Sequence, residues 1–232
     1  MTETPPSRTY AIPDLHGRFD LLRLALERIA ADAAGAPYTV VTLGDYVDRG
    51  PESRLVIEGL MGHDDAAFRL VCLRGNHEGM MFAAIVGEMR PAWWLSNGGA
   101  ETLLSYGHPT GGAYRPSVVP RAHTTWMIER PCLYRDEFRV YVHADIDETK
   151  PLAEQNDELL TWGRRKRDED VAYPGLYVVH GHTPFDDGPV ILAGRCNLDT
   201  RAWKTGRLCV GVFRDDVPGG PIDVLIIEGE PA

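Results

Sequence analysis

The segment 44–50 places two carboxylates and an arginine within five residues, and reads Gly-Asp-Tyr-Val-Asp-Arg-Gly after an apolar run. Clustered aspartates are unfavourable in a strand and costly to bury unless positive charge lies beside them. A metal ion together with a phosphate group would satisfy Asp45, Asp48 and Arg49. These residue types therefore indicate phosphate chemistry at a metal centre, provided that other segments supply further ligands.

Polar clusters also follow four other predicted strands. In an open α/β sheet, ligands bind beside the carboxyl ends of the strands. We therefore expect one crevice that these clusters share with Asp45. In chain order they are Asp14 and His16, Asn76 and His77, His143, and His180 and His182.

The apolar pattern predicts three β-α units in succession, which favours parallel strands joined by right-handed crossovers. Region 87–130 has no clear period and predicts short helices and loops, whereas strands dominate after Cys132, and their short connections predict antiparallel or mixed pairing. No linker or repeat divides the chain, so 1–232 is predicted to be one domain with a loose tail at 1–8. The predicted strands are 9–12, 38–43, 68–73, 133–134, 140–144, 176–180, 190–192, 208–213 and 224–227, and the predicted helices are about 22–33, 51–61, 76–86 and 152–160.

Composition narrows the function classes. A formal net charge of -10 argues against a general nucleic-acid binder, and a hydrophobic fraction of 44% supports a sizeable core. The four cysteines form no Cys-x-x-Cys pair and are expected to be reduced core thiols. The N-terminal residues lack the basic and apolar regions of a secretory signal, and no apolar run reaches the ~18 residues that a membrane span needs. We expect a cytoplasmic protein without membrane contact, of undetermined oligomeric state.

Five motifs in sequence order carry a family resemblance. Together they resemble the phosphoprotein-phosphatase branch of the calcineurin-like metallophosphoesterases, and within it the small bacterial and phage serine/threonine phosphatases. The resemblance covers about 9–213 and implies an α/β fold, with a central β-sandwich of mixed sheets flanked by helices in four layers. The motifs are Asp14-Leu15-His16-Gly17, the segment 44–50, Gly75-Asn76-His77-Glu78, Val142-His143-Ala144 and Gly181-His182-Thr183.

The resemblance implies two divalent metal ions that share Asp45. Asp14 and His16 would complete the first ligand set, and Asn76, His143 and His182 the second. Oxygen and nitrogen ligands without thiolate favour Mn²⁺, with Fe or Zn²⁺ as alternatives, over Ca²⁺.

The resemblance also assigns roles outside the ligand sets. His77 would be the general acid and Asp48 would orient it, while Arg49 and Arg164 would hold phosphate oxygens through forked hydrogen bonds. Arg165 and Arg167 lie close enough in sequence to compete with Arg164.

The implied function is hydrolysis of phosphomonoesters, foremost phosphoserine and phosphothreonine in proteins, by direct attack of a hydroxide that bridges the ions. The alternative is a phosphoanhydride hydrolase similar to the symmetrical diadenosine tetraphosphatases, which share these motifs. A third hypothesis is an inactive binding scaffold. It is disfavoured because all six ligands, His77 and Asp48 are present.

Several features depart from the pattern or stay outside it. Asp145 and Arg201 stand where the family usually has glycine, so Asp145 could affect the second metal and Arg201 could add positive charge at the mouth of the site. The tryptophans Trp93, Trp94 and Trp162 are expected in the core rather than in a substrate groove. The run 165–167 is expected to be solvated surface, and the histidines His63, His108, His123 and His180 receive no role.

Overall fold

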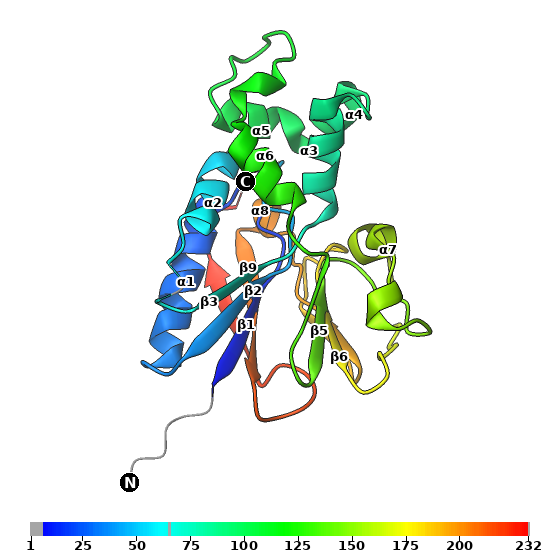
Figure 1. The fold of residues 1–232 in the computed structure, drawn as a ribbon. Coiled ribbons are helices and arrows are strands. Elements are labelled where there is room, and N and C mark those ends of the chain that lie inside the picture. The colour runs from blue at the N-terminus through cyan, green and yellow to red at the C-terminus, as the bar shows by residue number, and fades with distance from the viewer. Residues whose placement is uncertain (1–6, 65, 232) are drawn as a thin grey trace.

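The first three β-α units form the parallel part of the structure. The computed structural model describes residues 7–64 and 66–231 (Figure 1). Strand β1 pairs in parallel with β2, and β2 pairs in parallel with β3, as predicted. These units comprise β1 (Arg8–Ile12), α1 (Phe19–Ala33), β2 (Tyr38–Thr42), α2 (Ser53–Met61), β3 (Arg69–Cys72) and α3 (Asn76–Val86).

Two strands from the end of the chain complete this first sheet. β9 (Arg207–Arg214) runs antiparallel to β1, and β10 (Asp223–Glu228) runs antiparallel to β9. The sheet order is β10-β9-β1-β2-β3. The chain therefore returns to its own first strand, which joins residues about 200 positions apart, as in the hydrogen bond from Thr9 to Asp215.

The second sheet has the order β4-β5-β6-β8-β7 and is mixed. Strands β5, β6 and β8 are parallel neighbours, whereas β4 and β7 are antiparallel edge strands. The expectation of short connections was wrong for β5 to β6, since a crossover with η3 and α7 joins them and makes the pair parallel. The elements are β4 (Leu133–Arg135), β5 (Arg139–Val142), η3 (Leu152–Glu154), α7 (Asp157–Trp162), β6 (Tyr177–His180), β7 (Val190–Ile191) and β8 (Arg195–Asn197).

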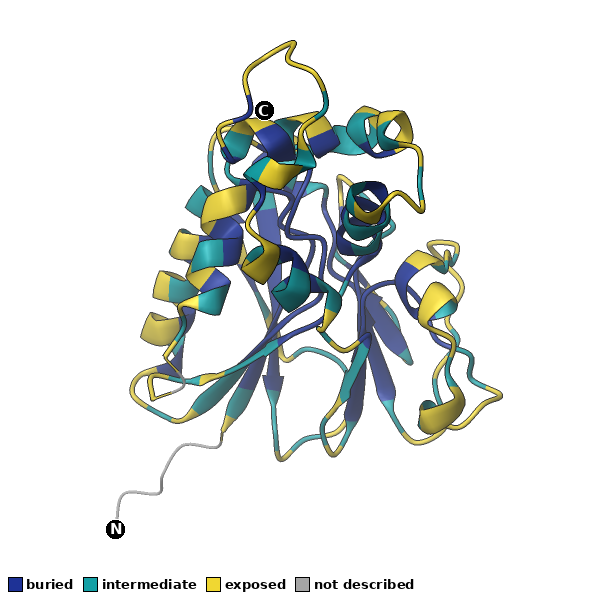
Figure 2. Ribbon diagram, turned by 45° about the horizontal axis from the view of Figure 1, so that its top comes forward, coloured by how far each residue is buried: buried dark blue, intermediate teal, exposed yellow. Residues whose placement is uncertain are grey.

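The two sheets pack against each other through a buried apolar layer. Its side chains come from both sheets and include Ala11, Val41, Tyr141, Val179 and Phe213. A second cluster lies between the first sheet and its helices, and a third lies between the second sheet and α7. Figure 2 shows the strands largely buried, with the exposed residues on the outer faces of the helices. The result is the predicted sandwich of mixed sheets flanked by helices.

The middle region consists of short helices, as predicted. They gather around α3 at one end of the sheets (Figure 1), and this is also the end at which the parallel strands terminate. They are α4 (Pro91–Trp94), the π-helical turn η1 (Leu95–Gly99), α5 (Ala100–Ser105), the short helix η2 (Pro116–Val118) and α6 (Arg121–Ile128).

Some boundaries differ from prediction. Arg8, expected in a loose tail, is part of β1 and forms an ion pair of 2.6 Å with Asp32; residues 1–6 lie outside the described part. Helix α2 begins at Ser53 rather than at Pro51, because Glu52 has a non-helical backbone and donates its N–H to the Gly17 carbonyl.

The cysteines lie in the core, as expected. All four cysteine side chains are buried, and none of these described residues takes part in a disulfide. Among the described helices, none combines the length and apolar character that crossing a bilayer requires.

Candidate active site

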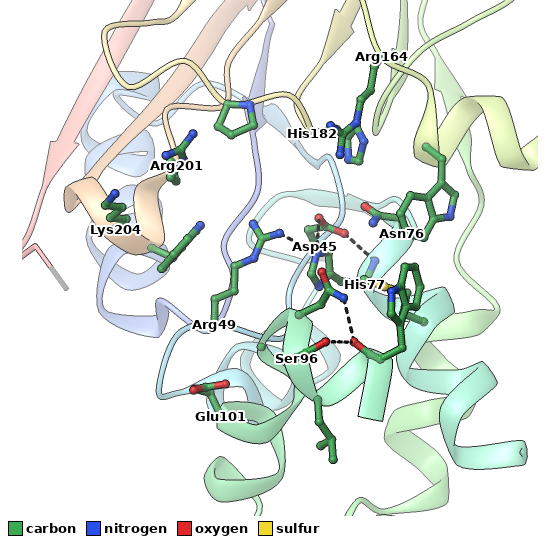
Figure 3. Close-up of a pocket in the computed structure, with 18 residues that line it drawn as sticks. Asp45, Arg49, Asn76, His77, Ser96, Glu101, Arg164, His182, Arg201 and Lys204 are labelled. Atoms are coloured by element: carbon green, nitrogen blue, oxygen red, sulfur yellow. Dashed lines mark hydrogen bonds and ion pairs between the residues drawn. The ribbon is translucent and has the colours of Figure 1, made fainter. Parts of the chain in front are cut away.

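All five polar clusters meet at the end of the sheets that the middle helices cover. Each predicted ligand follows a strand or begins the helix after one, and each is at least half-buried. Figure 3 shows Asp45, Asn76, His77 and His182 converging from different elements. The sequence therefore placed these residues correctly at one edge of the fold.

The loops that carry the site have an uncommon backbone. Asp45, Asp48 and Arg49 have φ of 52°, 74° and 70°, and His16 and His182 have φ of 42° and 66°. Left-handed conformations are rare for non-glycine residues and persist only where the surrounding structure holds them. Concentration of this strain in the predicted site residues is typical of a functional centre.

Asp45 lies at the centre of the site. Its Oδ2 atom is 3.5 Å from Nε2 of His16, 3.4 Å from Nε2 of His143 and 3.9 Å from Nε2 of His77. Its Oδ1 atom accepts the backbone N–H of His77. One carboxylate oxygen is therefore anchored, while the other faces the three imidazoles.

Hydrogen bonds on the far side of the rings fix two of these imidazoles. Nδ1 of His16 lies 2.8 Å from the Val47 carbonyl oxygen, and Nδ1 of His143 lies 2.9 Å from that of Leu43. A carbonyl oxygen can only accept, so each Nδ1 carries a proton, and each Nε2 is the ring nitrogen that would bind a metal ion once it is deprotonated. Metal-binding histidines in proteins are held in the same way.

A second group of donor atoms surrounds Nε2 of His143. It lies 3.0 Å from Oδ1 of Asn76 and 3.1 Å from Nδ1 of His182. Atoms that bind one ion at about 2.0–2.2 Å are about 3 Å from one another. Four described donors of mixed O and N type therefore fit a divalent cation, which the group Asp45, His143 and His182 supports.

The first predicted ligand set is less compact. His16 and Asp45 group with His77 rather than with Asp14 in the described donor clusters. Asp14 lies beside them, with its Oδ1 accepting the backbone N–H of His182 at 3.1 Å. The His77 ring is farther from Asp45 than the His16 ring is, so it lies at the edge of this donor group.

Burial and mutual charge shift the protonation of these groups. Burial raises the pKa of Asp14 to about 6 and lowers the pKa of His182 to about 3. Burial alone would lower the pKa of His143, but the Asp45 and Asp14 carboxylates outweigh it and raise that pKa to about 10. Carboxylates and imidazoles lie side by side in this buried cluster, and the carboxylates would balance the charge of a bound cation.

His77 is oriented by a buried carboxylate. Its Nδ1 lies 2.6 Å from Oδ2 of Asp48, whose side chain is fully buried. The Asp48 carboxylate also accepts Nε1–H of Trp94 at 3.0 Å and the Thr102 hydroxyl at 2.7 Å. Nε2 of His77 is thereby directed into the site. Trp94 is fully buried, as expected, although it also holds this carboxylate.

Arg49 reaches across the centre. Its guanidinium lies 2.9 Å from Nε2 of His16 and 3.0 Å from Nε2 of His77. It also stacks over Trp203 at 5.5 Å. The same lone pair of His16 cannot accept this hydrogen bond and bind a metal ion, so a ligand role for His16 requires Arg49 to release it.

Glu78 has a structural role that the sequence alone did not indicate. Its buried carboxylate accepts the backbone N–H groups of Asp45 at 3.0 Å, Tyr46 at 2.8 Å and Gly75 at 2.9 Å. Burial raises its pKa to about 7. Its place in the motif Gly75–Glu78 was the available signal, but only the fold shows that it ties the loop 44–47 to α3.

A cavity of about 800 Å³ opens above this centre. Eighteen residues line it, among them Asp45, Arg49 and His77, and five others that we call the groove wall are exposed or half-buried. The core assignment of Trp93 and Trp162 was wrong, since their exposed fractions are 50% and 37%. The groove wall comprises Trp93, Trp162, Arg164, Arg201 and Lys204.

Among the neighbouring arginines, Arg164 lines the cavity, whereas its competitors have other partners. Arg165 binds Asp145 at 2.5 Å and Glu148 at 2.7 Å, and Arg167 binds Asp187 at 2.7 Å. The expectation that Arg165 is solvated was wrong because this ion-pair network buries it. Asp145 faces Arg165, and no contact with His143 is found for it in the described residues.

Two short elements near the groove wall were not predicted. β8 has one strongly apolar residue among three, and helix α8 (Ala202–Thr205) has four residues, so neither gives a periodic signal. α8 nevertheless follows Arg201 and carries Lys204 at the cavity.

The family model for calcineurin-like phosphoesterases matches residues 7–210. The chain belongs to the calcineurin-like phosphoesterase family. The family implies divalent metal ions, and the donor clusters around Asp45 offer groups that could hold them. The resemblance drawn from the five motifs and the implied fold are confirmed.

Relatives of this calcineurin-like phosphoesterase differ in substrate. The chain is 31% identical over 137 residues to a symmetrical bis(5′-nucleosyl)-tetraphosphatase from Neisseria meningitidis, covering 59% of this chain and 43% of the relative. It is 28% identical over 140 residues to serine/threonine-protein phosphatase 1 from Salmonella typhimurium, covering 59% and 58%. The chain thus spans about half the length of these relatives.

The fold likeness extends over the whole chain. A serine/threonine phosphatase structure from Saccharomyces cerevisiae superposes with a TM-score of 0.67 at 14% identity, covering 100% of this chain and 82% of the other. Identity at this level reports the shared fold alone.

Proposed function

We propose that this phosphoesterase hydrolyses the phosphoanhydride bond of dinucleoside polyphosphates. Phosphoserine and phosphothreonine proteins, the leading substrates expected from the sequence, become the second candidate. One observation places the dinucleoside polyphosphates first. The groove wall has more positive charge than a single phosphoryl group needs.

The donor clusters support two divalent ions, with Mn²⁺ as the first choice and Fe or Zn²⁺ as alternatives. When bound, two such ions would lower the pKa of a water molecule and stabilise charge on the transferred phosphoryl group. Asp45 would serve both ions. The remaining ligands would be Asp14 and His16 for the first ion, and Asn76, His143 and His182 for the second.

The residues around the ions supply binding and a proton. Arg49 and Arg164 hold non-bridging oxygens of the reacting phosphate through forked hydrogen bonds. Arg49 must leave Nε2 of His77 when it turns to the phosphate, so that this nitrogen can carry a proton. As a water molecule attacks phosphorus and the bond to the leaving oxygen breaks, Nε2 of His77 gives that proton to the leaving oxygen. Asp48 keeps the ring in place through Nδ1.

Positive charge continues beyond the reacting phosphate. Figure 3 shows Arg201 and Lys204 on one side of Asp45. Arg164 lies on the other side, so cations flank the centre on both sides. A polyphosphate chain would place negative charge along this whole line, whereas a phosphoserine brings one phosphate. The protein carries a net charge of -10, whereas the cavity is lined by four cations, Arg49, Arg164, Arg201 and Lys204, against two carboxylates, Asp45 and Glu101. The excess of cations is a local exception that concentrates anionic substrates.

The second candidate has its own support. The Salmonella relative is named a serine/threonine-protein phosphatase, and the cavity opens to the surface beside exposed tryptophans that could contact a peptide. The catalytic residues do not separate the two substrates, because both present a phosphoryl group to the same centre.

The decisive experiment compares kcat/KM on diadenosine tetraphosphate and on a phosphoserine peptide with Mn²⁺-loaded protein. We expect the dinucleotide to be the better substrate. Arg201→Ala and Lys204→Ala should each lower kcat/KM on it about 10-fold, and should change turnover of an aryl phosphate less than 2-fold. A preference for the phosphopeptide would replace the first candidate by the second.

The remaining expectations form part of this proposal. The net acidic charge supports a small-molecule or protein substrate rather than nucleic acid. A cytoplasmic location fits the buried thiols and follows from the composition rather than from the fold. We also propose that residues 1–232 form a single domain.

A further inference from the structure

Two large aromatic rings lie parallel and half-exposed at the cavity. The ring centroids of Trp93 and Trp162 are 6.2 Å apart, and their planes differ by 22°. Both side chains line the cavity, with exposed fractions of 50% and 37%. Tryptophan usually contributes to stability by burying its ring, so this exposed pair has surface available for a ligand.

Local contacts fix the backbone at Trp93 and the ring of Trp162, and the two rings stack on each other. The Trp93 carbonyl accepts hydrogen bonds from the Ser96 hydroxyl at 2.9 Å and from the Asn97 amide at 2.8 Å. The Trp162 ring packs edge-to-face on His182, with centroids 6.4 Å apart. Trp162 is therefore in direct contact with a predicted metal ligand. The pair is pre-organised, which lowers the entropy lost when a ligand binds.

The two neighbouring tryptophans on α4 have opposite environments. Trp94 is fully buried and donates to Asp48 in the catalytic centre. Trp93 points to the cavity instead. Fixing Trp94 in the core thus sets the direction of Trp93, because consecutive side chains on a helix point about 100° apart.

We propose that the Trp93–Trp162 pair binds the nucleobase of the substrate by stacking. This inference rests on the proposed function and names the part of the substrate that the metal centre does not contact. Two nearly parallel flat rings match a flat ligand, and base–aromatic stacking tolerates any base. Trp162 precedes Arg164 by two residues, so the platform adjoins the phosphate-binding arginine.

The arrangement orders the substrate along the cavity. The base lies on the Trp93–Trp162 pair, the reacting phosphate lies over Asp45, and further phosphates extend toward Arg201 and Lys204. The tryptophans touch no reacting atom. They determine specificity through binding, so the loss of Trp93, which does not contact a predicted ligand, raises KM for a nucleotide substrate.

The test uses two competitive inhibitors that differ only in the base. Adenosine 5′-monophosphate and ribose 5-phosphate are compared in the Mn²⁺-loaded protein, with turnover of an aryl phosphate as the signal. We expect the nucleotide to bind about 10-fold more tightly than the sugar phosphate. In Trp93→Ala the difference should shrink to less than 2-fold, and Trp93→Phe should restore most of it. Nucleotide binding followed by calorimetry gives a readout independent of turnover.

Each other outcome is decisive. Equal inhibition by the two ligands in the unaltered protein, or a difference that survives Trp93→Ala, overturns the platform. So does a loss in Trp93→Ala that affects a phosphopeptide but not the nucleotide. A failure of the proposed function appears elsewhere, in the relative rates on dinucleotide and phosphopeptide. The inhibitor comparison does not depend on those rates.

Discussion

The floor of the cavity and the groove wall differ in almost every physical respect. The floor, which we define as Asp45, Asp48, His77, Glu78 and His143, is buried and hydrogen-bonded on nearly every side. The groove wall is exposed or half-buried, and its cations make few contacts, such as the 3.3 Å ion pair of Arg201 with Asp186.

The difference separates two tasks. A strained, buried floor keeps the reacting groups in fixed positions, which is what transition-state stabilisation requires. The groove wall can vary without disturbing the core, since its side chains extend into solvent. We therefore expect floor changes to alter kcat for every substrate and wall changes to alter KM for particular substrates.

Asp45→Asn is the strongest test of the floor. The amide would weaken binding of both ions and remove the central negative charge that faces three imidazoles, so we expect activity to fall at least about 1,000-fold. Steady-state rates at several Mn²⁺ concentrations measure the loss, and circular dichroism checks that the fold is retained. Full activity would contradict the two-ion centre.

His77→Asn should have the next largest effect. Removal of a general acid is expected to lower kcat about 100-fold on substrates with poor leaving groups, and less on aryl phosphates whose leaving group needs no proton. The measurement is a comparison of leaving groups of different basicity. An equal loss across the series would assign His77 to metal binding instead, as its proximity to Asp45 also permits.

Glu78→Gln tests the support of the floor. An amide nitrogen would replace one of the two acceptor oxygens and leave at least one buried N–H without a partner, so we expect about 3 kcal/mol of destabilisation. The midpoint of thermal unfolding should fall by about 6–12 °C. The matched control is Glu88→Gln, an exposed position just after α3, which should leave the midpoint unchanged.

Asp145→Asn tests whether the wall depends on the ion-pair network behind it. Asp145 holds Arg165, and Arg165 adjoins Arg164, so weakening the pair should misplace the phosphate-binding arginine and lower kcat/KM about 10-fold.

In a protein that already carries Arg164→Ala, the Asp145→Asn substitution should lower kcat/KM by less than a further 2-fold, because its effect depends on Arg164. Asp187→Asn is the matched control, because it removes the exposed partner of Arg167 and should be silent. A full additive loss would show that Asp145 acts on the metal centre directly.

The sequence by itself determined the chemistry. The predicted ligands, together with His77 and Asp48, follow predicted strands in a fixed order, and parallel strands bring their carboxyl ends to one edge. The β-α alternation of 9–86 also determined the parallel half of the first sheet, because apolar periodicity over long segments is a strong signal.

Only the tertiary structure decided how the cavity is lined. Trp93 and Trp94 are adjacent residues of the same type, so the sequence does not distinguish them. Their opposite burial depends on which face of α4 meets Asp48. The role of Glu78 depends on backbone N–H groups 31 to 33 residues away. Side-chain partners at such distances are set by packing, which local pattern does not encode. The sequence therefore indicates phosphate chemistry at a metal centre, and the fold shapes the cavity that a substrate would enter.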